Sequence, residues 1–263
     1  VNGNNNTFVA WNWKANGGTT TTNDASSTNI GSIDSVFQAN TTAGLSIVTY
    51  TGVAASNQTV AHGLQVGGVA TVPEMIMFKK RGSTSNWNVL HPSRASNDHY
   101  LQLNTNSVSI NTNTPFANTA PTTTVFTVGA SDGDVNTNAE SHIAFCFASV
   151  EGYSKFGSYT GNGAADGTSV NIGFRPAFVM VKRIDVANNW IINDATRTPF
   201  NEITGGSSTL YADTTNKESD LSTNVDFLSN GFKARTSAAH RNAAGTYMYM
   251  AFAEAPFKYA NAR

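Results

Sequence analysis

A long stretch of this chain occurs twice, and that duplication limits the fold more than any other sequence feature. The stretch from Pro73 to Arg94 reads Pro-Glu-Met-Ile-Met-Phe-Lys-Lys-Arg and then, after a short polar segment, Asn-Trp-Asn-Val-Leu. The stretch from Pro176 to Arg197 repeats its Pro, Lys, Asn-Trp and Arg at a constant offset of about 103 positions. Self-similarity at a fixed period indicates repeated structural units. We therefore interpret the chain as a duplication.

Each copy of the stretch is expected to form two β-strands joined by a hairpin. Met75 to Phe78 and Phe178 to Val181 are apolar runs of strand length, and basic residues follow each run. The polar segments 81–85 and 185–188 have the length of hairpin connections, and each precedes the tryptophan that starts the next strand. The two copies therefore predict two equivalent β-hairpins.

The wider sequence predicts an all-β fold with two tandem units. Residues 44–154 contain about eight short apolar segments with turn-rich connections, and residues 155–263 repeat much of that pattern. No segment of ten residues has helical periodicity, and the pattern is typical of antiparallel β-sandwiches of jelly-roll or Greek-key type. Because no linker separates the repeats, we expect them to pack side by side rigidly.

Residues 1–43 precede the first repeat and divide into a strand and a linker. The segment from Thr7 to Lys14 aligns with the closing strands of both repeats, at 141–147 and 246–252. We expect it to close a preceding repeat of a longer polypeptide, or to complete the sheet of a neighbouring chain. Residues 15–43 are rich in Gly, Thr, Asn and Ser, so a linker draped over the surface is expected there, not a core element.

Charge and hydropathy exclude several classes of protein. Charged residues make up 13% of the chain, about half of the usual share of roughly 25%. The net charge of −1 argues against a nucleic-acid-binding protein, which needs a basic surface. No run of about 18 apolar residues is present, and the first residues lack the pattern of a signal peptide, so no membrane insertion is expected.

Candidate catalytic carboxylates are few, and their positions favour structural roles. Glu151 and Glu254 follow the closing strand of each repeat, and an active site is rarely built twice at the same place in a scaffold. Asp194 precedes Arg197 by three residues, which suits a local salt bridge; His91 stands at the equivalent place in the first copy. Glycoside hydrolysis needs two carboxylates flanking the bond that breaks. No catalytic residue is assigned.

No metal or cofactor site is expected either. The histidines do not have metal-site spacing; they are His62, His91, His99, His142 and His240. The segment 132–136, Asp-Gly-Asp-Val-Asn, resembles part of a calcium loop but lacks the terminal acidic ligand, so it is interpreted as a hairpin tip. The single cysteine, Cys146, lies in an apolar run and is interpreted as a small buried residue.

Ligand contacts are expected mainly in the loops that differ between the repeats. Trp87 and Trp190 would suit stacking on sugars, but tryptophans present in both copies inside strands favour a place in the core. The segments 111–121, 205–220 and 237–244 differ between copies and are better candidates for a contact surface. No individual ligand-binding residue is assigned.

Five motifs spread along the chain are distinctive. They are Phe8 to Gly18 (FVAWNWKANGG), Ser46 to Gly52 (SIVTYTG), Phe147 to Gly163 (FASVEGYSKFGSYTGNG), Gly173 to Phe178 (GFRPAF) and Met250 to Lys258 (MAFAEAPFK). Together they resemble a recurrent domain of virion proteins from tailed bacteriophages. The domain is associated with tail-fibre-like structural proteins of marine and cyanobacterial phages, usually toward the C-terminal end of a longer polypeptide. The resemblance covers nearly the whole chain and supplies no catalytic residues.

The resemblance implies a non-enzymatic structural protein of the virion. The first hypothesis is a tail-fibre or appendage domain that contacts a host-surface receptor, a glycan, through variable loops. The second is a purely architectural component, such as a capsid decoration, neck or tail protein. The third is a polysaccharide depolymerase. Other virion subunits are the expected partners, together with copies of the same chain in a homo-oligomer, for which a trimer is favoured.

Overall fold

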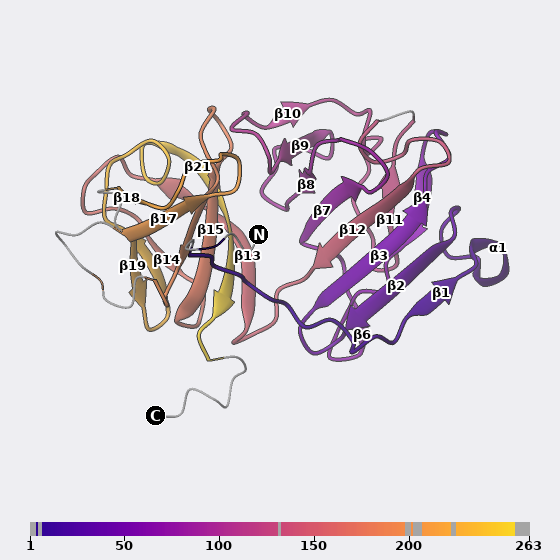
Figure 1. Cartoon of the computed structure of the whole chain (residues 1–263), viewed down its shortest axis with the longest axis horizontal. Helices are drawn as coiled ribbons and strands as arrows, with labels where there is room; N and C mark the ends of the chain where they lie inside the picture. Colours follow the sequence, from indigo (N-terminus) through magenta and orange to yellow (C-terminus); the bar gives the residue numbers. More distant parts are fainter. Residues whose placement is uncertain are drawn as a thin grey trace.

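The computed structural model describes residue 4 and residues 7–130, 133–197, 201, 207–221 and 225–255. It confirms the all-β fold class: strands pair antiparallel throughout the named sheets, and the described residues contain one short helix, α1 (Ala25–Thr28). The strands gather into two halves that follow each other along the chain (Figure 1). Within the described part, no helix is long and apolar enough to cross a membrane.

The first half is built on an antiparallel sheet, with a smaller sheet over one of its faces. In spatial order the strands of the large sheet are β1 (Thr21–Asn23), β2 (Ser35–Asn40), β3 (Leu45–Thr51), β12 (Ser141–Phe147), β7 (Met75–Lys80), β8 (Asn88–Leu90), β9 (His99–Gln102) and β10 (Ile110–Asn111). The smaller sheet pairs β11 (Val125–Val128) with β4 (Gln58–Ala61), and a separate hairpin joins β5 (Gln65–Val66) to β6 (Val69–Ala70).

The second half repeats this arrangement. Its large sheet has the order β13 (Ser154–Gly161), β21 (Gly245–Ala253), β15 (Pro176–Arg183), β16 (Ile191–Asp194), β17 (Ser207–Tyr211) and β18 (Ser219–Leu221). The smaller sheet has the order β14 (Ser169–Asn171), β20 (Gly231–Ala234) and β19 (Val225–Leu228). The series β13-β21-β15-β16-β17 therefore corresponds to β3-β12-β7-β8-β9, and the pair β14-β20 to β4-β11.

A Tyr-Thr-Gly motif lies at the end of β3 and of the corresponding strand β13, and it serves the same purpose in both repeats. The Tyr50 hydroxyl donates to the Val135 carbonyl at 2.7 Å, and the Tyr159 hydroxyl donates to the Arg241 carbonyl at 2.6 Å. A Cβ added at Gly52 would lie 2.3 Å from the Thr137 carbonyl oxygen, and the position equivalent to it, 161, is equally tight. Glycine is thus required because a backbone segment passes too close for a side chain.

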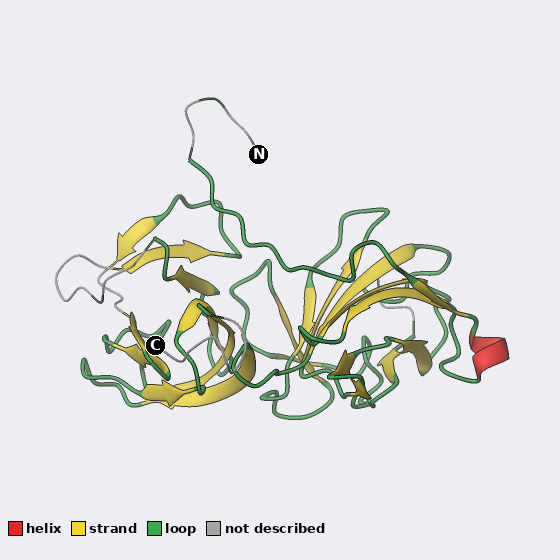
Figure 2. Ribbon diagram, turned by 90° about the horizontal axis from the view of Figure 1, so that it is seen from below, coloured by secondary structure: helices red, strands yellow, loops and turns green. Residues whose placement is uncertain are grey.

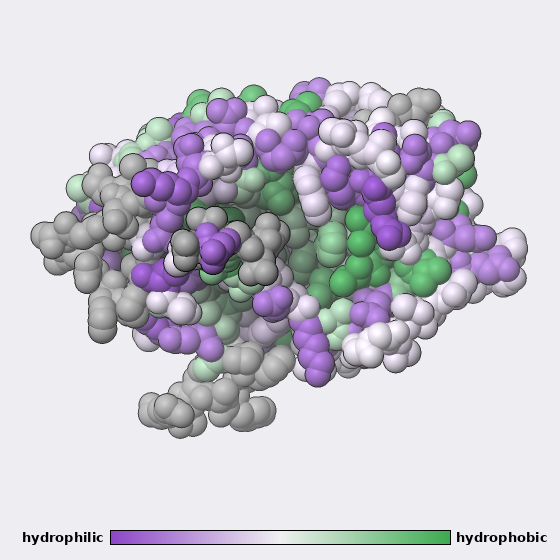
Figure 3. Space-filling view, viewed as in Figure 1, coloured by the Kyte–Doolittle hydropathy of each residue, from purple (hydrophilic) through white to green (hydrophobic). Residues whose placement is uncertain are grey.

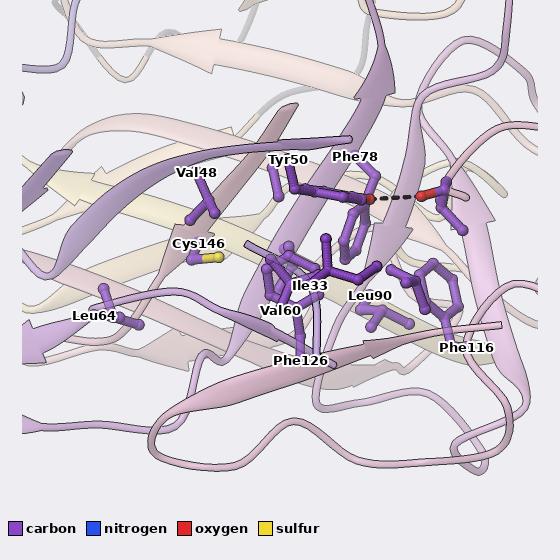
Figure 4. Close-up of a cluster of buried hydrophobic side chains, with 14 of the residues drawn as sticks. Ile33, Val48, Tyr50, Val60, Leu64, Phe78, Leu90, Phe116, Phe126 and Cys146 are labelled. Carbon is purple, nitrogen blue, oxygen red and sulfur yellow. Dashed lines mark hydrogen bonds between the residues drawn. The ribbon is translucent and has the colours of Figure 1, made fainter. Parts of the chain in front are cut away.

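Alternate residues of each large sheet enter two different cores, because side chains alternate across a strand. One face of the first sheet packs under β4 and β11 around Val48, Tyr50, Phe78 and Phe126 (Figure 4). Cys146 is a fully buried free thiol in this cluster, as its apolar surroundings predicted. The corresponding face of the second sheet packs against β14, β19 and β20.

The opposite faces of the two large sheets share a third core, which joins the repeats. Phe147 packs against Phe156 and Phe252 with ring centroids 5.8 and 6.3 Å apart. The Trp190 indole is fully buried there and donates to the Gln102 carbonyl at 2.9 Å across the junction. Both faces of each large sheet therefore bury apolar residues, and the expected rigid packing of the repeats has a physical basis.

The structure corrects the expectations for residues 1–43. The described residues 7–16 form no strand; instead the segment crosses from the second half to the first (Figure 2). The linker expected over 15–43 is also wrong, because β2 pairs with β3 along its whole length and Ile33 lies in the core. Polar composition concealed β2, whose side chains are half-buried at most positions. Residues 21–40 thus belong to the first repeat.

Candidate functional site

A groove of about 560 Å³ lies where the N-terminal segment crosses the junction. Three segments form its wall: the N-terminal segment, the turn between β2 and β3, and the connection between β12 and β13. The residues lining it are Lys14, Ala15, Asn16, Gly17, Asn40, Thr42, Ala43 and Tyr153. Four of these eight residues carry an amide, a hydroxyl or a phenol, three are Ala or Gly, and one side chain is charged.

Two tryptophans hold the N-terminal wall of the groove in place. Trp11 and Trp13 contact Phe178 edge-on, with centroids 5.4 and 5.8 Å apart, and Trp13 also contacts Phe252 at 5.3 Å. The Arg197 guanidinium lies 6.0 Å from the centroid of the Trp11 ring, in reach of a cation–π contact. These contacts fix an irregular segment that has no strand partner.

The remaining walls are fixed by hydrogen bonds and ring packing. Asn40 Nδ2 donates to the Lys14 carbonyl at 2.9 Å, which ties the β2–β3 turn to the N-terminal segment. The Tyr153 ring packs edge-on against Phe252 at 5.7 Å. Burial raises the pKa of the Tyr153 phenol, so it is protonated at neutral pH and keeps a donor as well as an acceptor. The groove is therefore pre-formed and nearly neutral.

Such a lining suits a neutral, hydroxyl-rich ligand. Amide and hydroxyl groups both donate and accept hydrogen bonds, and an aromatic ring offers an apolar face. A ligand site usually combines a shaped cavity with a few polar groups that fix orientation. Asn16 and Thr42 line the groove and are exposed, so their side chains are placed to contact such a ligand.

Two smaller cavities lie in the first half. One of about 260 Å³ opens between β2 and β3 and includes Asp34, Tyr50 and Arg81 in its wall. Another of about 210 Å³ lies beside Phe37 and Leu64. Both are small, so the groove at the junction is the strongest candidate site.

The loops expected to form the contact surface do not line the groove. Phe116 anchors the segment 111–121 in the core. Arg241 and Asn242, in the segment 237–244, are buried as well, so the centre of this segment is interior, against expectation. Residues 205 and 206 of the third segment lie outside the described residues. Sequence reasoning missed the groove, whose signal was the pair of tryptophans before Asn-Gly-Gly.

The acidic residues weighed as catalysts are mostly engaged in ion pairs. Glu254 binds Arg175 at 2.8 Å, and Asp194 binds Arg197 at 2.7 Å, as the spacing of that pair predicted. Glu218 binds the same arginine at 2.6 Å. Glu151 is exposed. Two carboxylates held by one guanidinium are poorly placed to act as an acid and base pair.

The residues considered as metal ligands do not gather in one place within the described part of the chain. No group of three or more potential ligands occurs among the described residues. Asp134 accepts hydrogen bonds from the backbone and side chain of Asn86, both at 3.0 Å, while Asp132 lies outside the described residues. Trp87 is only half-buried and stacks on Phe145, with ring centroids 6.2 Å apart. Both tryptophans were expected in the core, but only Trp190 is fully buried.

No curated protein matches the chain, and no solved structure matches it. One protein-family model, described as a domain of unknown function (DUF7483), matches residues 1–256. Because this match covers both repeats and the N-terminal segment that forms the groove, the chain belongs to the DUF7483 family.

Proposed function

We propose that this chain is a non-enzymatic structural domain of a tailed-phage virion, placed in a tail fibre or appendage, that contacts a glycan on the host surface. The groove at the junction carries this proposal, because its wall offers amides, hydroxyls and an aromatic ring with little charge. The resemblance of the Tyr-Thr-Gly and Phe-Val-Ala-Trp motifs to phage structural proteins supplies the setting. The contact surface is then the groove and not the variable loops.

Binding to host-surface polysaccharide tests this proposal. The purified chain is applied to polysaccharide extracts of candidate hosts and to a glycan array, beside the variants Asn16→Ala and Thr42→Val. Each variant is expected to weaken binding about tenfold, which corresponds to the loss of about 1.4 kcal/mol from one hydrogen bond. Asn113→Ala, an exposed position away from the groove, is the control. If all three variants bind as tightly as the unaltered chain, the groove is not the binding site.

A purely architectural role is the second candidate, and a different surface favours it. Apolar atoms are exposed over β3 and β12 on the face of the first sheet (Figure 3). Val36 is 37% exposed on this sheet, and Ile47, Met77 and Phe145 are half-buried. Exposed apolar patches and unpaired sheet edges are commonly covered by other subunits. The homo-oligomer proposed for this chain, with a trimer favoured, would use such a surface.

A further inference from the structure

A fully buried arginine in the second repeat has no charged partner among the described residues. Arg241 is 1% exposed. Its Nη2 donates to the side-chain oxygen of Asn193, but its Nε and Nη1 are buried and have no hydrogen-bond partner. None of the ion pairs in the described part includes Arg241. A buried cation without a counter-charge is strongly destabilising, so this arrangement needs an explanation.

The tyrosines around Arg241 do not supply the missing negative charge. Tyr159, Tyr211 and Tyr247 lie near the guanidinium. Burial raises the pKa of both Tyr159 and Tyr247, so their hydroxyls are neutral at physiological pH. These two hydroxyls also donate to backbone carbonyls, those of Arg241 and Ala239, each at 2.6 Å. The guanidinium charge therefore has no internal counter-charge in this group.

The first repeat shows that the scaffold does not require an arginine here. Val135 occupies the place of Arg241, since each gives its carbonyl to the tyrosine of the Tyr-Thr-Gly motif. Val135 is fully buried in the apolar core of the first repeat. The fold thus closes equally well over an apolar side chain at this position.

The residues beside Arg241 are also polar in the second repeat where the first repeat has apolar ones. By the strand registers, Asn193 corresponds to Leu90, and Thr209 corresponds to Tyr100. Leu90 and Tyr100 belong to the apolar core, whereas Asn193 and Thr209 are buried polar residues that are hydrogen-bonded to each other at 3.3 Å. Three core positions that touch in the second repeat are therefore polar together. A coordinated replacement of this kind indicates a built site and not an isolated substitution.

We propose that Arg241, oriented by Asn193, binds a small monovalent anion of the size of chloride in the interior of the second repeat. The anion accepts hydrogen bonds from Nε and Nη1 and neutralises the guanidinium. Water would satisfy the two N–H groups but would leave the charge unbalanced, which is why an anion is favoured over water. This site is independent of the glycan groove.

Bromide substitutes for chloride and scatters X-rays anomalously, so it reveals the site directly. Crystals of the chain grown in sodium bromide are expected to show an anomalous peak within hydrogen-bonding distance of Arg241 Nε and Nη1. An ordered water at that place, or a carboxylate of the protein itself, would overturn the proposal.

A solution measurement provides the second readout. The melting temperature is followed at constant ionic strength while chloride replaces gluconate, because a ligand that binds only the folded state stabilises it by mass action. The unaltered chain is expected to melt at higher temperature as chloride rises, and Arg241→Met and Arg241→Val are expected to lose this dependence. Arg235→Met, at a surface arginine paired with Asp166, is the matched control and should keep it. An equal chloride effect in all four proteins would contradict the site.

Discussion

At the residue scale, two buried histidines show how polar groups are accommodated inside these sheets. The backbone N–H of Leu64 donates to His62 Nδ1 at 3.0 Å, and that of Ser93 donates to His91 Nδ1 at 3.2 Å. An Nδ1 that accepts a hydrogen bond carries no proton, so both rings are neutral. Burial lowers the pKa of each to about 4, from an ordinary value of 6.5.

Stability should therefore fall in mild acid. Below pH 6.5 the unfolded chain takes up protons that the folded chain refuses, so the histidines' contribution is complete above pH 6.5 and is lost as the pH falls toward 4. For each pH unit that the pH falls in this window, each of the two histidines is expected to lower the unfolding free energy by about 1.4 kcal/mol. Urea unfolding from pH 8 to pH 4.5 measures the slope. Burial also lowers the pKa of His240 to about 4, so His91→Asn should remove about a third of the slope. An unchanged slope would show that His91 does not titrate as described.

At the element scale, the N-terminal segment is held by side chains and not by strand pairing. Trp11 and Trp13 anchor it on the second repeat, and Asn40 ties it to the first. Its alignment with the closing strands of both repeats predicted a strand, but residues 7–16 are paired with no strand in the described part of the chain. The same segment supplies half of the groove wall. Its position should therefore govern both stability and ligand binding.

Removal of one anchor tests this role. Trp13→Ala is expected to lower the unfolding free energy by about 1–3 kcal/mol, less than for a fully buried tryptophan because Trp13 is half-buried. Glycan binding should weaken with it. Phe8→Ala lies in the same segment, but Phe8 is 57% exposed, so it serves as a control and should change neither quantity. Equal effects of the two substitutions, measured by chemical unfolding, would argue against anchoring by Trp13.

The sequence predicted the elements that are strongly apolar and missed those that are not. The strand at Leu45–Thr51 and both copies of the Pro-to-Arg hairpin follow from apolar runs and from the duplication. β2 was missed because Thr, Ser and Asn surround it and its hydrophobic residues are few. The groove was missed because it is formed by segments distant in sequence. Arg241 gave no signal until the hydrogen bonds of Tyr50 and Tyr159 aligned it with Val135.

At the scale of the whole molecule, the duplication has produced one body and not two independent domains. The shared core contains Phe147 and Met75 from the first repeat and Phe156, Phe178 and Trp190 from the second. Backbone hydrogen bonds also cross the junction: the Asn188 N–H donates to the Asn106 carbonyl at 2.8 Å. Separating the repeats would expose this core to water, which is strongly unfavourable.

Thermal unfolding should consequently be a single transition. We expect one calorimetric peak whose van't Hoff enthalpy equals the calorimetric enthalpy, because neither repeat is stable with the shared core exposed. Phe147→Ala, which opens a cavity in that core, should lower the melting temperature while keeping one peak. Two resolved peaks in the unaltered chain would mean that the repeats unfold independently.

The position of the chain in a phage particle tests the central claim most directly. A cryo-EM map of an intact virion that carries this chain would show whether the groove lined by Asn16, Thr42 and Tyr153 faces solvent or another subunit. Our account predicts a groove open to solvent on a tail fibre or appendage, at the surface that first meets the host. A groove covered by neighbouring virion subunits would contradict receptor contact and would assign the chain an architectural role.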